Sequence, residues 1–313
     1  MDRRQFGKSQ PGGRVRLVVG AVAAVSLLLG TGCSPTADST PSADPGLAVD
    51  PTLAAAVPPQ YRQDGVLLIA NDPSYPPMEF IASGNRVGAD IDLANAIAAV
   101  VGLRTEFADQ AFSTIVPSVG IGRYELGLSS LWAVDRRSPL ANMTTYFQAG
   151  TQFAVRTSGR GPSTPGMGLC GYSVSVEEGS EVVDMLADQS KACRAANQKP
   201  IRIAARESQQ IANQLLIKGR VTAMVADSPV VTWLVKNNDG RVRVLGPPSN
   251  LRDYGIATPI GSGGWATVVR DAIKLLIERG EYTRILKRWS IEQGAISDPK
   301  VIPASPSIPV ANP

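Results

Sequence analysis

The chain has 313 residues, with 31 Lys and Arg, 27 Asp and Glu, and no histidine. The missing imidazole excludes Ser-His-Asp and Cys-His catalysis, histidine-ligated zinc and any histidine acid or base. Residues 1–32 hold five of the basic residues and one acidic residue, so the remainder is neutral with 26 of each and lacks the concentrated basic charge of a nucleic-acid-binding protein.

Residues 1–32 have the pattern of an export signal. Basic residues precede LVVGAVAAVSLLLG, an apolar run too short to span a bilayer, and small residues lead to Cys33. The LLLGTGC ending resembles a bacterial lipobox, with Gly30 where leucine is usual, and predicts a lipid on Cys33. RRQFGK also resembles a twin-arginine signal, so the export route stays open between Sec and twin-arginine. We expect an exported lipoprotein, anchored to the outer face of the cell membrane through Cys33 only.

Two further segments have the composition of disordered chain. Residues 33–60 are rich in Pro, Ser, Thr, Ala and Asp, and are predicted to form a tether. Residues 297–313 repeat that composition and are predicted to form a disordered tail. The chain between them is long enough for two compact lobes of about a hundred residues each.

Between these segments, predicted strands and helices alternate. Short apolar or β-branched runs predict strands at 66–70, 104–108, 124–130, 151–156, 172–176, 201–205, 221–227, 241–246 and 254–259. Apolar residues at three and four spacing predict helices within 91–102, 207–220 and 264–280. This alternation predicts an α/β fold with mainly parallel sheets.

Three cysteines leave an odd one over in an exported protein. A lipidated Cys33 accounts for it. Cys170 and Cys193, 23 residues apart, are then predicted to form a disulfide, which would stabilise the fold by about 3 kcal/mol in the loop-entropy model.

The remaining chemistry is that of binding. The cysteines of the fold are not in CxxC spacing, GSGG at 261–264 lacks the features of a nucleotide-binding loop, and no acidic calcium-binding loop occurs. We therefore expect no catalytic residue, no cofactor and no metal site. The groups that remain available to bind a ligand are carboxylates, hydroxyls, guanidinium groups and aromatic faces.

Several motifs in order resemble one family. NDPSYPPMEF, NRVGADIDLANAIAAVVGL, FSTIVPSVGIGRYELGLSSLWAVDRR and TTYFQAGTQFAV, followed by LCGYSVSVEEGSEVVDML, GRVTAMVADSP and GGWATVVRDAIKLLIERGEYTRILKRW, look like the extracellular solute-binding proteins that capture polar amino acids for ABC importers. The resemblance covers about residues 61–292, and the cysteine pair resembles actinobacterial members.

That resemblance implies the periplasmic-binding-protein type II architecture. Lobe one would comprise residues 61–150 and 250–296, lobe two residues 151–249, with the strands at 151–156 and 241–250 crossing between them. The protein is expected to be a monomer that closes over an amino acid and delivers it to an ABC permease and its ATPase.

In the family, the arginine after the third-strand loop takes the ligand's α-carboxylate, a role that falls here on Arg137. A guanidinium presents a fork of donors that matches a carboxylate. Ser129 and Ser130 would complete the carboxylate's hydrogen bonds. Trp132 departs from the family, which often has Ser or Thr there; its N–H could donate, its ring could narrow the pocket, or it could simply pack in the core.

Tyr75 and Phe112 correspond to the aromatic pair that encloses the ligand's side chain, although Phe112 could also be ordinary core. The prolines after Asp72 stiffen the loop that carries Tyr75 and direct Asp72 toward the far end of the ligand.

Lobe two would contribute Ser180 at a helix start and Asp227 as partner of the α-ammonium. Glu181 stands where the family has a hydroxyl; it is either a solvated first-turn acid or, with Asp72, part of an acidic side-chain end that favours arginine, lysine or ornithine.

Two other functions stay open from the sequence. The same fold resembles cyclohexadienyl dehydratases, for which Glu79 or Glu177 would supply the acid. An extracellular amino-acid sensor has the same sequence features as a transport receptor.

Overall fold

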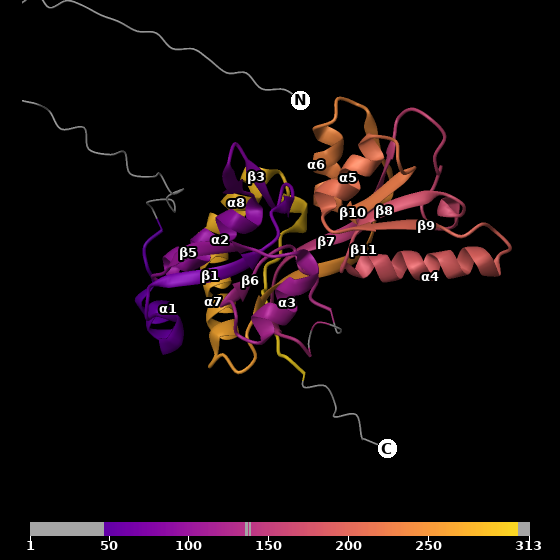
Figure 1. Ribbon diagram of the computed structural model, residues 1–313. Helices are drawn as coiled ribbons and strands as arrows, with labels where there is room; N and C mark the ends of the chain where they lie inside the picture. Colours follow the sequence, from indigo (N-terminus) through magenta and orange to yellow (C-terminus); the bar gives the residue numbers. More distant parts are fainter. Residues whose placement is uncertain (1–46, 135–136, 138, 306–313) are drawn as a thin grey trace, which may run out of the picture. The chain divides into compact units, whose positions relative to one another are not determined.

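The computed structural model describes residues 47–134, 137 and 139–305 (Figure 1). The predicted signal at 1–32, the predicted lipid site at Cys33, the start of the predicted tether and the last residues of the predicted tail lie outside the described residues. Within the described part, no helix combines the length and apolar character needed to cross a membrane.

The described chain is built on one large mixed sheet, in the order β5-β1-β6-β11-β7-β10-β8-β9, with β12 paired to β7. The outer strands pair in parallel, whereas β7 and β11 pair antiparallel with each other and with β10 and β6 respectively. The strands are β1 Val66–Asn71, β5 Arg104–Asp109, β6 Leu126–Gly127, β7 Asn142–Arg156, β8 Ser173–Glu177, β9 Arg202–Arg206, β10 Ala223–Asp227, β11 Val242–Thr258 and β12 Val301–Ile302.

A small antiparallel sheet of three strands stands apart from the large one. It comprises β2 Ser74–Tyr75, β3 Glu79–Ala82 and β4 Asn85–Val87. This sheet carries the proline-rich stretch, in which the peptide bond between Pro76 and Pro77 is cis.

Helices lie on both faces of the large sheet; in Figure 1, α5 and α6 lie on one side of β8–β10 and α4 on the other. The α-helices are α1 Pro51–Ala56, α2 Ala89–Val100, α3 Phe112–Gly120, α4 Glu181–Ala195, α5 Gln209–Ile217, α6 Ser228–Lys236, α7 Trp265–Glu278 and α8 Glu281–Trp289. Short 3-10 turns occupy Pro59–Tyr61, Gly166–Leu169 and Glu292–Gly294. The predicted α/β fold is confirmed.

The apolar spacing explains why α7 forms and where it packs. Its buried positions recur every three or four residues from Trp265 to Leu276, so one stripe faces the core while the other face is polar. The helix stops before Gly280, which has a φ of 75° and costs little in that conformation because it has no Cβ.

Strands β7 and β11 run through the middle of the sheet and join its first half, β5-β1-β6, to its second half, β10-β8-β9. They are longer than the runs predicted at 151–156, 241–246 and 254–259, because β11 continues through register shifts between Leu245 and Arg252. Since pairing is continuous through both halves, the sheet order does not test the predicted lobe bounds, which stay a prediction.

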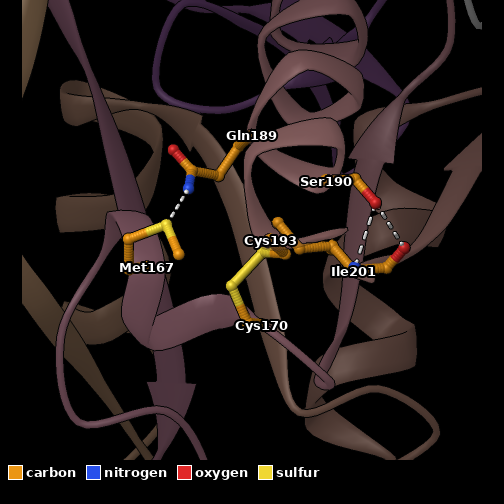
Figure 2. Close-up of a disulfide and its surroundings, with 6 residues drawn as sticks. All are labelled: Met167, Cys170, Gln189, Ser190, Cys193 and Ile201. Atoms are coloured by element: carbon orange, nitrogen blue, oxygen red, sulfur yellow. Dashed lines mark hydrogen bonds between the residues drawn. A yellow bond between two sulfur atoms is a disulfide. The ribbon is translucent and has the colours of Figure 1, made fainter. Parts of the chain in front are cut away.

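The predicted disulfide between Cys170 and Cys193 is present (Figure 2). It ties the turn before β8 to the last turns of α4. Beside it, the Ser190 hydroxyl oxygen accepts from the Ile201 N–H at 3.1 Å and donates to the Ile201 carbonyl at 3.3 Å. These two hydrogen bonds hold Ile201, at the end of the connection from α4 to β9, against the helix.

The prediction of disorder is wrong for parts of both flanking segments. Asp50 caps α1 by accepting from the N–H groups of Thr52 and Leu53, and Val57 is buried in the core with 1% exposure. Lys300 pairs with Thr145, so β12 joins the edge of β7. Composition failed here because a few apolar residues among prolines suffice when an existing core receives them.

Candidate functional site

A pocket of about 330 Å³ opens between residues 75–132 on one side and 176–227 on the other. Seven of the predicted site residues line it: Tyr75, Phe112, Ser130, Trp132, Ser180, Glu181 and Asp227. Asp72, Ser129 and Arg137 do not line it. The remaining walls come from Val176, Glu177, Val182, Gln209, Val225 and Ala226.

Asp227 ends β10 and is the most strongly hydrogen-bonded group of the pocket. Its Oδ2 accepts from the Trp132 indole N–H at 3.1 Å and from the Tyr254 hydroxyl at 2.6 Å. Its backbone N–H donates to the Tyr75 hydroxyl at 3.1 Å. The side chain makes no ion pair with any described residue, and burial raises its pKa from 3.8 to about 6 against the opposing effect of these hydrogen bonds.

Trp132 packs in the core and also lines the pocket, whereas donation of its N–H to a ligand stays a prediction. The residue is 5% exposed and belongs to the core, and its indole N–H reaches across the pocket to Asp227. An isolated bridge to Tyr254 fixes its backbone, so both donors to the Asp227 carboxylate come from one supported unit. Sequence reasoning missed Tyr254, because nothing in the run YGIATP distinguishes it from an ordinary buried strand residue.

Arg137 is 5% exposed and lies against Glu181 instead of the pocket wall. Its Nε is 3.0 Å from Glu181 Oε1, its Nη1 donates to the Trp132 carbonyl at 3.1 Å, and its guanidinium carbon lies 5.2 Å from the Phe112 ring centroid. It lines a neighbouring cavity of about 350 Å³ that shares Phe112. The Arg137 guanidinium is thus already paired with a carboxylate of the chain itself.

This pairing differs from the expectation for Glu181. The sequence placed its carboxylate with Asp72 at the side-chain end of the ligand, and also left open a solvated position. In the structure Glu181 lines the pocket and its carboxylate pairs with Arg137, with the side chain only 14% exposed, so it is not a solvated acid; its contact with a ligand stays a prediction. No local pattern in the sequence indicates this pair, since it joins residues 44 positions apart on different elements.

Asp72 and Ser129 support the pocket from behind. The Asp72 carboxylate accepts from the Phe112 N–H at 3.0 Å at the start of α3, and its own N–H donates to the Ser129 hydroxyl oxygen at 3.1 Å. Burial raises the pKa of Asp72. Its hydrogen bond to the Phe112 N–H holds Phe112 at the pocket wall, and the contact of Asp72 with a ligand stays a prediction.

Ser130 rests on a pair of buried carboxyl groups, Glu79 and Asp90. Asp90 Oδ2 accepts from the Ser130 N–H at 2.9 Å and from the Tyr146 hydroxyl at 2.8 Å, while Glu79 Oε1 accepts from the Ser129 hydroxyl at 2.9 Å. Burial and the neighbouring Asp90 raise the pKa of Glu79 well above its usual value, and burial raises that of Asp90 to about 6. Like charges this close favour a shared proton.

Gly88 permits this approach. With a φ of 141°, it precedes α2, and a Cβ at this position would lie 2.0 Å from the Met78 carbonyl oxygen. Without one, the Asp90 N–H donates to that carbonyl at 2.9 Å, which sets Asp90 beside Glu79. Glu79, considered above as an enzymatic acid, therefore lies beneath the Ser129–Ser130 turn and outside the pocket wall.

At the other end of the pocket, Glu177 and Gln209 form a polar wall. Glu177 ends β8, is 3% exposed, and accepts from the Gln209 N–H at 2.9 Å at the start of α5. Ser180, which precedes α4, donates its hydroxyl hydrogen to the Glu177 carbonyl at 2.8 Å. The sequence raised Glu177 only as an enzymatic acid and did not raise Gln209; the position of Glu177 after a predicted strand was the available signal.

The described residues contain no group of three or more metal-ligating side chains. The pocket therefore offers aromatic faces, hydroxyls, one amide and carboxylates. Such a set suits a small polar ligand that carries positive charge.

Together, the mixed sheet with two crossing strands and the pocket between residues 75–132 and 176–227 define a solute-binding protein. Residues 67–292 match the bacterial extracellular solute-binding proteins, family 3, and the chain belongs to this family. The family is one of binding proteins, in agreement with the expectation that the chain is not an enzyme.

Known proteins are similar over most of the chain. The arginine-binding protein ArgT of Corynebacterium glutamicum is 34% identical over 250 residues, which cover 79% of this chain and 82% of that protein. A solved ancestral arginine-binding protein bound to arginine has 28% identity and a TM-score of 0.65 over 72% of this chain and 98% of its own. An ancestral arginine-binding protein bound to glutamine gives 28% identity and a TM-score of 0.66, over 73% and 99%. The periplasmic-binding-protein type II fold is thereby confirmed.

The Arg137–Glu181 pair is expected to be strongly coupled. Arg137→Met removes the guanidinium from a largely buried carboxylate and should lower the free energy of unfolding by about 3 kcal/mol, whereas adding Glu181→Gln should restore part of the loss. Urea unfolding of both single variants and the double variant measures the coupling. Asp188→Asn breaks an exposed pair with Lys191 and serves as the control, with an effect below about 1 kcal/mol. Additive single losses would contradict the pairing.

Asp227 should make stability depend on pH. Because its pKa of about 6 in the folded state exceeds the ordinary 3.8, the stabilisation from protonation is complete below about pH 4 and is lost as the pH rises through 6. Relative to Asp227→Asn, the wild type should lose up to about 1.4 kcal/mol per pH unit between pH 4 and 6. Urea unfolding across this range measures the difference, and parallel profiles for the two proteins would contradict it.

Proposed function

We propose that the protein is the substrate-binding component of an ABC importer and captures a basic amino acid, with arginine, lysine and ornithine as the candidates. Membership of the solute-binding family and the 34% identity to an arginine-binding protein support this proposal. Capture involves no covalent step. The loaded protein then delivers its ligand to a permease driven by an ATPase.

The observation that carries the proposal is the uncompensated carboxylate of Asp227. It lies 97% buried in the pocket, and no described cation pairs with it. A buried charge without a partner is costly, so the site has a strong preference for a ligand that brings a cation. The α-ammonium of an amino acid supplies that charge, and the Trp132 and Tyr254 donors keep the carboxylate in place to receive it.

In this proposal, the α-carboxylate of the ligand binds the guanidinium of Arg137. That guanidinium is engaged by Glu181 at 3.0 Å, so ligand binding exchanges one carboxylate for another. The stacking of Arg137 on Phe112 and its bond to the Trp132 carbonyl hold the guanidinium in position during the exchange. Glu181 thereby lowers affinity without abolishing the carboxylate site.

Closure follows from contacts that join the two sides of the pocket. Tyr75 and Trp132, on one side of the pocket, form hydrogen bonds with Asp227 on the other side. Arg137 and Glu181 form an ion pair across the same two sides. A ligand that contacts Asp227 and Arg137 together binds only the arrangement in which both sides are close. It therefore shifts the population toward that arrangement by its difference in affinity.

The ligand is tested by thermal unfolding of the purified protein with each common amino acid, L-ornithine, and sugars as controls. At a hundredfold excess over Kd, arginine or lysine should stabilise by about 2.7 kcal/mol and raise Tm by several degrees. Asp227→Asn should abolish the shift because the α-ammonium loses its partner. A shift with glutamine or glutamate alone would reject a basic ligand, and no shift with any amino acid would reject the proposal.

We further propose that a lipid on Cys33 holds the protein at the outer face of the membrane, with the signal at residues 1–32 removed. The lipobox-like LLLGTGC supports it. One acyl-type anchor binds membranes through its buried methylene groups and requires no spanning helix.

Anchoring is tested by substituting the acceptor in the native host. Cys33→Ser should move the protein from the membrane fraction to the medium, because no thiol remains to carry the lipid. Cys193→Ser, which leaves Cys33 intact, serves as the control and should stay with the membrane. Equal membrane association of Cys33→Ser and wild type would reject the anchor.

A further inference from the structure

Glu177 is a pocket carboxylate whose charge is balanced by no described residue. Its side chain is 3% exposed and lies in the pocket wall at the end of β8. Its hydrogen bond comes from the Gln209 N–H at 2.9 Å, and it forms no ion pair within the described chain. A carboxyl group so placed has a reason to be there only if something in the pocket interacts with it, since an apolar residue would close the wall at lower cost.

Gln209 adds a neutral acceptor beside this carboxylate. It is 1% exposed, lines the pocket, and its side-chain N–H₂ donates to Asn213 Oδ1 at 2.8 Å and to Met224 Sδ at 3.2 Å. Both amide hydrogens are then engaged, which leaves the amide oxygen as its free hydrogen-bonding group. With Glu177 ionised, Glu177 and Gln209 together offer acceptors and no free donor.

We propose that Glu177 and Gln209 form the subsite that recognises the cationic end of the ligand's side chain, and that Glu177 is the residue that determines preference for a charged over a neutral side chain. This inference rests on the proposed function, in which Asp227 and Arg137 hold the α-ammonium and α-carboxylate. It assigns to Glu177 the role that sequence analysis predicted for Asp72 and Glu181, whose carboxylates are bound to Phe112 N–H and Arg137 in the structure.

The groups around Glu177 determine its ionisation. Asp72 and Asp227 are acidic neighbours, Tyr75 is a buried phenol, and burial together with the two acids raises the pKa of Glu177 well above its usual value. The opposing influences, which lower its pKa, are the hydrogen bond from the Gln209 N–H and the Ser74 side chain.

No described cation offsets these acids at Glu177. Arg206, its register neighbour on β9, is exposed and donates to the Ala205 carbonyl. Burial and the two acids therefore shift Glu177 toward the neutral carboxylic acid in the empty pocket.

Binding a cationic side chain reverses that preference. The O–H bond of the Glu177 carboxylic acid breaks, its proton passes to solvent, and the resulting carboxylate pairs with the ligand's guanidinium or ammonium. A neutral side chain leaves the acid protonated and uses it as a hydrogen-bond donor to a carbonyl oxygen. Cationic and neutral ligands of one shape should therefore differ in proton release.

Arginine and citrulline provide that comparison, because citrulline replaces the guanidinium by a neutral urea group of similar shape. Calorimetric titration of the purified protein at pH 7.5 in phosphate and in Tris, buffers of different ionisation enthalpy, counts the protons released. Arginine should release more protons than citrulline, because only a cationic side chain favours the ionised form of Glu177. Asp227 meets the same α-ammonium in both ligands, so its contribution cancels in the difference.

Glu177→Gln should weaken arginine binding by about 10- to 100-fold, leave citrulline within about threefold, and abolish the extra proton release. Glu178→Gln removes the same charge from the exposed neighbouring position and should change none of these quantities. Retained citrulline binding also shows that the Glu177 variant is folded.

The outcomes separate this inference from the function on which it rests. If the wild type binds neither arginine nor citrulline, the proposed function fails. If it binds arginine and Glu177→Gln binds both ligands with unchanged ratio, or if the extra proton persists in that variant, the subsite assignment fails while the function stands.

Discussion

The buried carboxylate of Asp227 is the group on which the pocket depends. Trp132 and Tyr254 donate to its side chain, and its N–H donates to Tyr75, so three aromatic residues from separate segments converge on one strand end. An acid in this position is costly unless it is hydrogen-bonded, and the aromatic donors reduce that cost without supplying a positive charge. The site is therefore prepared for a cation while remaining stable without one.

The charge around the pocket explains both how a ligand is held and why the empty site persists. Glu181 neutralises Arg137, whereas Asp227 and Glu177 retain no ionic partner among the described residues. In the proposed function, a basic amino acid repeats this arrangement with its own groups, offering a carboxylate to Arg137 and two cations to the acids. In the same proposal, a neutral side chain offers Glu177 no cation and therefore gains less.

Beneath the pocket, a second pair of acids serves the fold. Glu79 and Asp90 share a buried position and direct their oxygens at the Ser129–Ser130 turn. Their approach requires the absence of a side chain at Gly88, where α2 begins against the Met78 carbonyl. Some buried carboxyl groups therefore hold the backbone, whereas others face the pocket. The degree of burial alone does not tell the two kinds apart.

The sequence by itself determined the alternating strands and helices, the disulfide of Cys170 with Cys193, and the family, because these depend on local periodicity, cysteine number and motif order. It also indicated Asp227, since an acid at the end of an apolar strand is locally visible. Tertiary structure alone decided that Glu181 pairs with Arg137, that Tyr254 and Gln209 join the site, and that α1 and β12 are folded. Each of these is a contact between residues distant in the chain, whose free energy depends on relative position and burial and therefore leaves no local pattern in the sequence.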